Sequence, residues 1–173
     1  MGWSACWPVS VVLAISVCTD LRNRRIPNWL VLPFLLLGLM LCAWQKGWSG
    51  LGMSLMGILL GAAVMGVFVI KGGMGMGDMK LCAALGAWLG PSQLTTALVL
   101  MALVGGVMAL LWAAAHGFLH TLFGGVVDLL ISIGKKGLRP HAQLTLAKAE
   151  SHAMPYAPAI AVGTLLSFFA LPR

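Results

Sequence analysis

Six apolar runs, separated by polar or glycine-rich stretches, constrain the fold of this chain more than any other feature. They cover residues 3–19, 29–45, 51–70, 80–91, 94–115 and 155–171. Hydrophobic residues make up 60% of the chain and charged residues only 9%, whereas soluble domains carry about 25% charged residues. A spanning helix needs roughly 20 residues, so six spans would use most of the chain. The sequence therefore predicts an all-α, polytopic membrane helix bundle of about six transmembrane helices, forming one membrane-embedded domain over residues 1–173.

Two segments affect the number of spans. Residues 3–19 lack a basic stretch before the apolar run, so we expect a retained first helix and not a cleaved signal. The long connection 117–153 contains an apolar stretch that is short for a span, followed by the basic residues 135–139. This pattern favours a cytoplasmic or interfacial loop that lies on the bilayer. A seventh span there is the alternative, and it would reverse the orientation of the C-terminal run.

The distribution of lysine and arginine predicts the orientation in the membrane. If the N-terminus lies outside, nine basic residues fall on the cytoplasmic side: Arg22, Arg24, Arg25, Lys71, Lys80, Lys135, Lys136, Arg139 and Lys148. Only Lys46 and Arg173 fall on the other side. This bias follows the positive-inside rule. The net charge of +7 therefore reports membrane orientation, and no nucleic-acid partner is expected.

Two of the four acidic residues stand at the edges of apolar runs. Asp20 ends the first run and precedes Leu-Arg-Asn-Arg-Arg-Ile-Pro-Asn, and Asp78 follows a glycine-rich stretch before the fourth run. The orientation predicted from lysine and arginine places both on the cytoplasmic face. Carboxylates at a membrane are costly and are rare unless they are paired or used in function. The structural alternatives are that Asp20 pairs with a nearby arginine and that Asp78 caps the following helix.

Proline and glycine shape the segments around these aspartates. Pro27 disfavours helix just before it, and Asn28 is predicted to cap the next helix. Residues 72–77 contain four glycines, among them Gly75 and Gly77, which predict a flexible and thin approach to Asp78. A phosphate-binding loop is disfavoured because the Gly-Lys-Ser/Thr ending is missing.

No cofactor and no metal are expected. The four cysteines contain no Cys-x-x-Cys pair and are interpreted as packing residues. His116 and His120 lie four residues apart, but no third ligand of the usual pattern accompanies them. The tryptophans lie mostly near the ends of apolar runs, which is typical of interfacial anchors. Of the seven tryptophans, the six to which this interpretation applies are Trp3, Trp7, Trp44, Trp48, Trp88 and Trp112.

Taken together, the motifs around the two aspartates resemble those of the prepilin peptidase family, the bacterial Gly-x-Gly-Asp membrane aspartic peptidases. The matching residues are Asp20, Arg22, Ile26, Pro27 and Asn28, then Gly75, Gly77, Asp78, Lys80 and Leu81. The segment 154–163 is also similar to the family's last helix. The resemblance implies that Asp20 and Asp78 are catalytic. It makes Gly75, Gly77, Arg22, Pro27, Asn28 and Lys80 candidates for shaping the site.

The resemblance also implies a substrate and a location. The expected partner is a pilin or pseudopilin precursor, whose short basic leader is removed at the cytoplasmic face of the bacterial inner membrane. Long family members carry two Cys-x-x-Cys pairs and methylate their product. This chain has neither pair, so it looks like the short form of Flp/Tad-type pilus systems, and N-methyltransferase activity is not expected.

Two carboxyl groups that share a water molecule suit hydrolysis, because one can act as a base while the other stays protonated. Which aspartate is the base stays open, as do the oligomeric state and the recognition of a basic leader. Two other functions fit these residues less well. A proton-coupled transporter component is disfavoured because no carboxylate continues across the membrane. A non-catalytic pilus or secretion assembly subunit is disfavoured because both motif aspartates are present.

Overall fold

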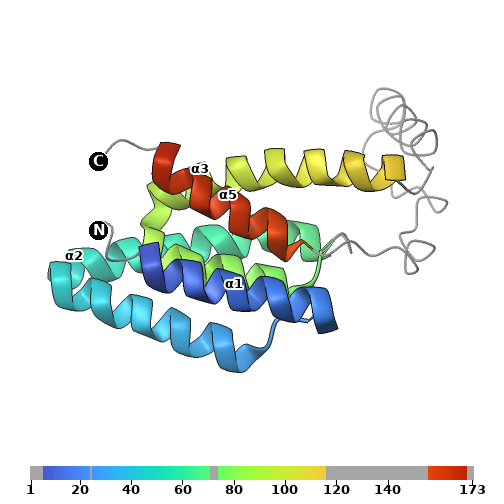
Figure 1. The fold of residues 1–173 in the computed structure, drawn as a ribbon. Coiled ribbons are helices and arrows are strands. Elements are labelled where there is room, and N and C mark those ends of the chain that lie inside the picture. The colour runs from blue at the N-terminus through green and yellow to red at the C-terminus, as the bar shows by residue number, and fades with distance from the viewer. Residues whose placement is uncertain (1–5, 24, 71–73, 116–155, 171–173) are drawn as a thin grey trace. The chain divides into compact units, whose positions relative to one another are not determined.

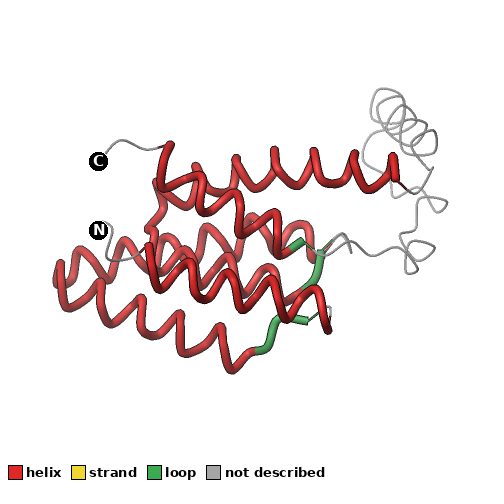
Figure 2. The backbone as a smooth tube through the Cα atoms, in the orientation of Figure 1, coloured by secondary structure: helices red, strands yellow, loops and turns green. Residues whose placement is uncertain are grey.

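The computed structural model describes residues 6–23, 25–70, 74–115 and 156–170. They form four helices: α1 (Cys6–Asn23), α2 (Asn28–Ile70), α3 (Met76–Ala115) and α5 (Ala157–Ala170) (Figure 1). The described part of the chain contains no strand (Figure 2), which confirms the all-α prediction for these residues. The predicted interfacial loop 117–153 and the pair His116 and His120 lie outside the described residues.

Two long helices bend at glycines. In α2 the backbone leaves helical geometry at Gly47, with φ of 60°, and in α3 it does so at Gly90, with φ of 72°. Positive φ is accessible to glycine at little cost, and Pro91 next to Gly90 cannot donate a helical hydrogen bond. Each bend divides one helix into two arms that follow two of the apolar runs. The chain reverses direction at the Gly47 bend (Figure 1).

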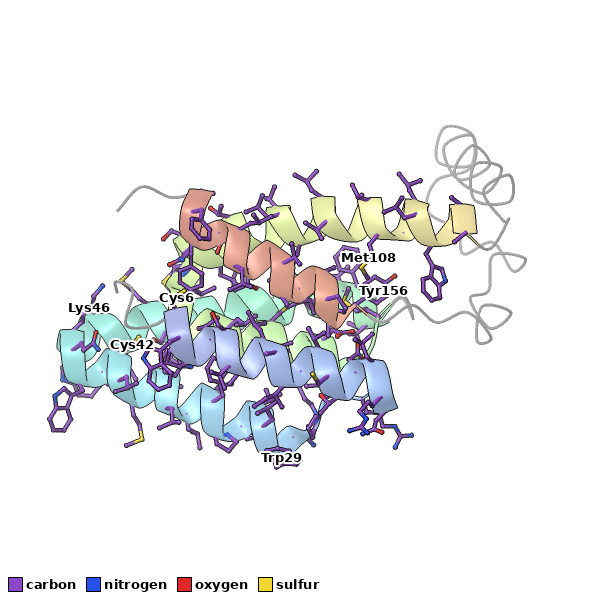
Figure 3. All side chains as sticks on the ribbon, in the orientation of Figure 1. Cys6, Trp29, Cys42, Lys46, Met108 and Tyr156 are labelled. Atoms are coloured by element: carbon purple, nitrogen blue, oxygen red, sulfur yellow. The ribbon has the colours of Figure 1, made fainter. Side chains whose placement is uncertain are left out.

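Both bent helices are apolar enough for a membrane. Asn28–Ile70 and Met76–Trp112 each reach a mean hydropathy of 2.4, and by length and composition they could cross a bilayer. Large apolar side chains also cover the outside, as Figure 3 shows, and Met40 is 70% exposed. An outer surface of this kind is favourable in lipid and unfavourable in water.

The tryptophans divide into two groups. Trp7, Trp29, Trp44 and Trp48 are largely exposed, as interfacial anchors would be. Trp88 differs from the prediction because only 4% of it is exposed. Its ring stacks on Phe34 with centroids 4.9 Å apart, and its indole N–H donates to the Phe34 carbonyl at 2.8 Å. Trp88 is therefore a core residue that joins α2 and α3.

Glycines allow the second arm of α2 to cross the first arm of α3 at backbone contact. A Cβ atom at Gly57 would collide with the carbonyl of Gly86, and one at Gly86 would collide with Gly57. A Cβ at Gly61 would lie 2.7 Å from the Cys82 carbonyl oxygen. Small residues at four-residue spacing permit such crossings between membrane helices. Gly57 and Gly61 are therefore packing residues of this helix crossing.

The chain divides into two compact units. Residues 1–105 and 155–173 form the first, and residues 106–154 form the second, of which the end of α3 is described. The candidate site lies wholly within the first unit. There the end of α1 and the beginnings of α2, α3 and α5 lie at one end of the unit, whereas the Gly47 bend lies at the other (Figure 1).

Candidate active site

Asp20 lies in the last turn of α1 and is almost buried, with 8% of its surface exposed. Its Oδ2 accepts a hydrogen bond of 3.2 Å from the backbone N–H of Ala157, the first residue of α5. The Tyr156 carbonyl accepts the first helical bond of α5, from Ile160, and Pro158 has no N–H. Asp20 thus satisfies a donor that would otherwise be free at the positive end of α5.

Asp78 lies in the first turn of α3 and is 7% exposed. The backbone N–H of Gly75, just before the helix, donates a hydrogen bond to its carboxylate. In a capping box, the side chain of the third helical residue accepts a hydrogen bond from the backbone N–H of the N-cap residue. Asp78 and Gly75 form this contact at the beginning of α3. Asp78 therefore caps α3, as the structural alternative proposed. The capping contact also fixes the direction in which the carboxylate points.

The two carboxylates lie in one electrostatic neighbourhood. Asp20 acts on Asp78 as a nearby like charge, although the two residues belong to different helices. Within the described residues Asp20 forms no ion pair, and Arg24 of the same motif lies outside them. The other two acidic residues, Asp128 and Glu150, also lie outside. The structure thus brings the two predicted aspartates together at one end of the first unit.

The loop between α1 and α2 lies directly against the beginning of α3. Ile26 is buried, and a Cβ atom built on Gly77 would lie only 3.1 Å from the Ile26 Cβ. Beside this contact, Lys80 Nζ donates to Asn28 Oδ1 at 3.1 Å. Gly77 is therefore required for close approach between the two motifs. Lys80 contacts the first motif through Asn28.

Four predicted site residues lie at the helix ends beside the two aspartates: Arg22, Pro27, Asn28 and Gly75. The Pro27 carbonyl accepts from the N–H groups of Leu30 and Val31, so Pro27 is the cap of α2. The prediction that Asn28 is this cap is wrong by one residue, because Asn28 is already the first helical residue and its side chain accepts from Lys80. Arg22 is exposed in the last turn of α1. Gly75 is exposed, and a Cβ there would lie 3.4 Å from Asp78 Oδ2.

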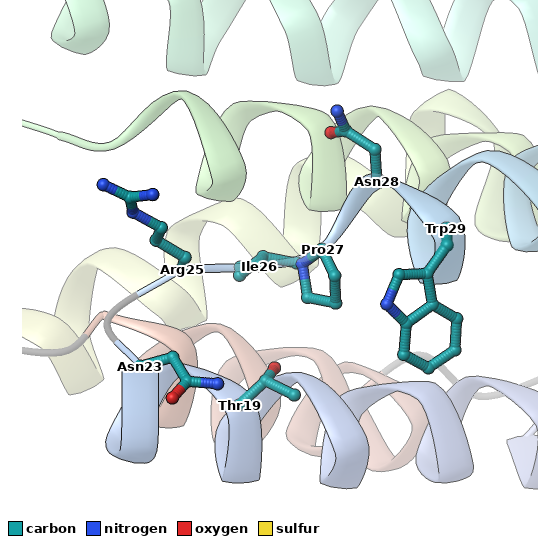
Figure 4. A pocket seen from close by; sticks show the side chains of 7 residues that line it. All are labelled: Thr19, Asn23, Arg25, Ile26, Pro27, Asn28 and Trp29. Atoms are coloured by element: carbon teal, nitrogen blue, oxygen red, sulfur yellow. The ribbon is translucent and has the colours of Figure 1, made fainter.

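An open pocket adjoins the Asp20 motif. Its volume is about 570 Å³, and it lies between the end of α1 and the loop that begins α2 (Figure 4). The lining is mixed: Ile26, Pro27 and Trp29 are apolar, and Thr19, Asn23, Arg25 and Asn28 are polar or charged. Thr19 directly precedes Asp20 in the chain. Neither Asp20 nor Asp78 is among the residues that line this pocket.

The last helix supplies a contact that the sequence did not reveal. The resemblance singled out the segment 154–163 without assigning any residue in it to the site. The structure identifies the Ala157 N–H as the group that holds Asp20. Pro158 was a usable signal, because proline is frequent in the first turn of a helix, where free N–H groups occur. Among the described residues, no group of three His, Cys, Asp or Glu side chains could hold a metal.

These features define a helical protein with two nearly buried carboxylates at one end of an apolar bundle, each held by a backbone N–H at a helix N-terminus. The sequence profile of the Type IV leader peptidase family matches residues 7–110, which is more than half of the chain. The chain belongs to this family.

Several curated relatives carry the name prepilin leader peptidase/N-methyltransferase. The protein from Xanthomonas campestris is 37% identical over 109 residues, which cover 57% of this chain and 36% of that relative. The one from Escherichia coli K12 is 40% identical over 103 residues, covering 56% and 44%. The one from Bacillus subtilis is 28% identical over 163 residues, covering 92% and 52%. The chain thus spans about half or less of these relatives' length. No solved structure matches it.

Proposed function

We propose that this chain is a membrane aspartic endopeptidase that removes the short basic leader from type IV pilin-like precursors, of the Flp type in particular. The observation that carries the proposal is that Asp20 and Asp78, both nearly buried, lie close enough at one end of an apolar helical bundle to act on each other as like charges. The matched relatives bear the name of a prepilin leader peptidase, which supports this substrate class. The N-methyltransferase activity in those names is not part of the proposal.

The proposed reaction is general acid–base hydrolysis of one peptide bond. Two carboxyl groups in close proximity resist simultaneous ionisation, so one keeps its proton. The ionised carboxylate takes a proton from a water molecule, which attacks the scissile carbonyl carbon. The protonated carboxyl donates its proton to the carbonyl oxygen. As the C–N bond breaks, the carboxyl that took the water proton passes it to the leaving amine, and a hydroxyl of the tetrahedral intermediate returns its proton to the other carboxylate. The pair titrates as a unit, so the two roles are assigned to the pair and not to single residues.

The backbone donors support this use of the pair. Ala157 N–H occupies one oxygen of Asp20, and Gly75 N–H is bound to Asp78. Each contact restrains the rotation of its carboxylate and leaves oxygen lone pairs free for water or substrate. A site held by fixed backbone groups needs little reorganisation during the reaction. In this scheme Asp20 and Asp78 are catalytic, and Arg22, Pro27, Asn28, Gly75, Gly77 and Lys80 shape the site.

The proposed setting is the bacterial inner membrane, crossed by about six helical segments. Basic residues cluster in the connections that adjoin Asp20 and Asp78, which supports a cytoplasmic position for the site and an outside N-terminus. A precursor whose basic leader stays in the cytoplasm, with its apolar helix in the bilayer, would then present the scissile bond at the level of the carboxylates.

The direct test is leader removal by the purified protein. The chain would be reconstituted in lipid vesicles with an Flp-type precursor, and the product would be sized by mass spectrometry in the presence of a metal chelator. The proposal predicts one cut between the leader and the apolar helix, unaffected by the chelator. An intact precursor, with folded enzyme shown by a cooperative melting transition, would contradict the proposed function. Loss of cleavage that added metal restores would contradict the mechanism.

A further inference from the structure

The contact between the α1–α2 loop and the beginning of α3 has two parts that lie side by side. Ile26 packs on Gly77 at near-minimal distance, with 3.1 Å from the Ile26 Cβ to a Cβ built on Gly77. Two residues further along α2, Asn28 Oδ1 accepts a hydrogen bond from Lys80 Nζ at 3.1 Å. We propose that these two contacts form a clip that holds the Asp20 motif against the Asp78 motif, with Asn28 and Lys80 as positioning residues.

The direction of the Lys80 side chain supports a positioning role. Lys80 follows Asp78 by two residues in α3, and residues two apart on a helix do not face each other. Asp78 is nearly buried, whereas Lys80 is exposed and its ammonium group reaches across to α2. The charge of Lys80 is therefore used on the Asn28 amide oxygen of the first motif.

The site needs a contact that fixes the distance between its two aspartate motifs, and the clip provides it. Asp20 is held by α5 and Asp78 by its own helix end, so neither backbone contact joins the two carboxylates to each other. Ile26 lies in the loop that follows the helix of Asp20, Asn28 begins α2 directly after that loop, and Gly77 and Lys80 flank Asp78. Contacts 26–77 and 28–80 thus set the separation of the two motifs. Small displacements of reacting groups strongly reduce rates, so a weak exposed bond can still matter for catalysis.

The first experiment measures the clip without using activity. Ile26 and Gly77 would be changed to cysteine, with the accessible Cys6 and Cys18 replaced by serine and the buried Cys42 and Cys82 kept. The 3.1 Å between the Ile26 Cβ and a Cβ built on Gly77 is slightly below the roughly 3.5–4.5 Å found in disulfides, so a small outward shift of the loop is enough for a disulfide to form with a mild oxidant. Adding Asn28→Leu or Lys80→Met should slow this crosslink about tenfold, because either change removes a hydrogen bond to a charged group. The rate of crosslinking is followed by mass spectrometry of the linked peptides. Unchanged crosslinking in both variants would overturn the clip.

The second experiment rests on the proposed function and uses a double-mutant cycle in precursor cleavage. Asn28→Leu and Lys80→Met should each lower kcat by roughly ten- to a hundredfold with little change in KM. The double variant should have about the same kcat as the less active of the two single variants. Asn28→Asp should stay near wild type, because a carboxylate also accepts from an ammonium group. If the losses of kcat in the two single variants multiply in the double variant, Lys80 acts independently of Asn28. The same conclusion follows if Lys80→Met lowers kcat while Asn28→Leu does not.

The matched control is Lys46→Met. Lys46 is exposed and lies at the opposite end of the first unit from Tyr156 (Figure 3). This variant should leave both crosslinking and cleavage unchanged. If the Ile26→Cys/Gly77→Cys protein forms the crosslink but wild-type protein cleaves no precursor, the result would contradict the proposed function while leaving the clip intact. If wild-type protein cleaves but the double-cysteine protein crosslinks equally well with Asn28→Leu, the result would contradict the clip alone.

Discussion

The Asp20 carboxylate at the end of α1 accepts a hydrogen bond from the backbone N–H of Ala157, 137 residues later in the chain. The contact joins the first and the last described helices at the level of Asp78. It makes the N-terminus of α5 part of the candidate site, beside the two segments that carry the aspartates. The positive end of a helix favours a charged carboxylate there.

This contact can be removed without removing a side chain. Ala157→Pro deletes the N–H, and proline is tolerated at the first helical position. Cleavage should fall roughly 10- to 100-fold, because hydrogen bonds to charged groups contribute about 1.5–3 kcal/mol. Ala157 is fully buried, so Ala157→Val is the control that adds bulk and keeps the N–H. Initial rates on a precursor peptide compare the two, and equal losses would mean that bulk alone matters.

The close approach of the two motifs depends on Gly77. Gly77→Val would force branched carbon atoms into Ile26, and Gly75→Val would place a side chain against Asp78, since a Cβ there lies 3.4 Å from Oδ2. Both should reduce turnover at least about tenfold, with a smaller loss of folded protein. Gly52→Val is the control, because a Cβ at Gly52 meets nothing within 4 Å. Turnover is normalised to protein recovered as a single peak by size exclusion. Full activity with valine at both positions would show that these glycines are only spacers.

Ser54 should stabilise the bend of α3. Its hydroxyl donates to the Ala87 carbonyl at 2.8 Å. This carbonyl belongs to the last turn before the Gly90 bend, where helical partners are missing and Pro91 has no N–H. Ser54→Ala should therefore lower the free energy of unfolding by about 0.5–1.5 kcal/mol. Thermal melting in detergent measures it. Ser49 is exposed, so Ser49→Ala should change the melting temperature little. An equal decrease in melting temperature in both variants would contradict the special role of Ser54.

The proposed acid–base pair predicts a bell-shaped dependence of cleavage on pH. At low pH both carboxyl groups are protonated and the base is lost, whereas at high pH both are ionised and the acid is lost. The value of kcat/KM should therefore fall on both sides of a maximum, and the maximum should lie at the pH where the pair carries one proton. The profile is measured with purified enzyme in a constant-ionic-strength buffer series. A plateau that extends to alkaline pH would contradict the requirement for a protonated carboxyl group.

Local sequence patterns predicted the helices well and their ends less well. The first apolar run was placed at residues 3–19, but α1 continues through Asp20 to Asn23, since no breaker occurs before Pro27. The short fourth run gains length because α3 begins at Met76, so Gly77 and Asp78 lie in its first turn. Trp88 resembled an interfacial anchor in sequence. Its burial depends on Phe34 and on the absence of a side chain at Gly38, which no local pattern reveals.

The candidate site was predicted as residues but not as contacts. The orientation predicted from lysine and arginine placed Asp20 and Asp78 on one face, and the structure brings them into the same neighbourhood. The Ala157 N–H was missed because a backbone donor has no sequence signature of its own. The Asn28–Lys80 hydrogen bond was missed because it joins residues 52 positions apart on different helices. Such contacts follow from tertiary packing, which single-chain periodicity does not encode.

The central claim is that Asp20 and Asp78 act as one catalytic pair, and conservative substitution tests it most directly. Asp20→Asn and Asp78→Asn keep size and much hydrogen bonding but cannot supply the charge and proton of the pair. Each should lower single-turnover cleavage of an Flp-type precursor at least about 10²-fold, and the double variant should lose little more. Asp128→Asn and Glu150→Gln, the other acidic positions, should cleave normally. Near-normal cleavage by either Asp20→Asn or Asp78→Asn, in protein that melts as the wild type does, would contradict the claim.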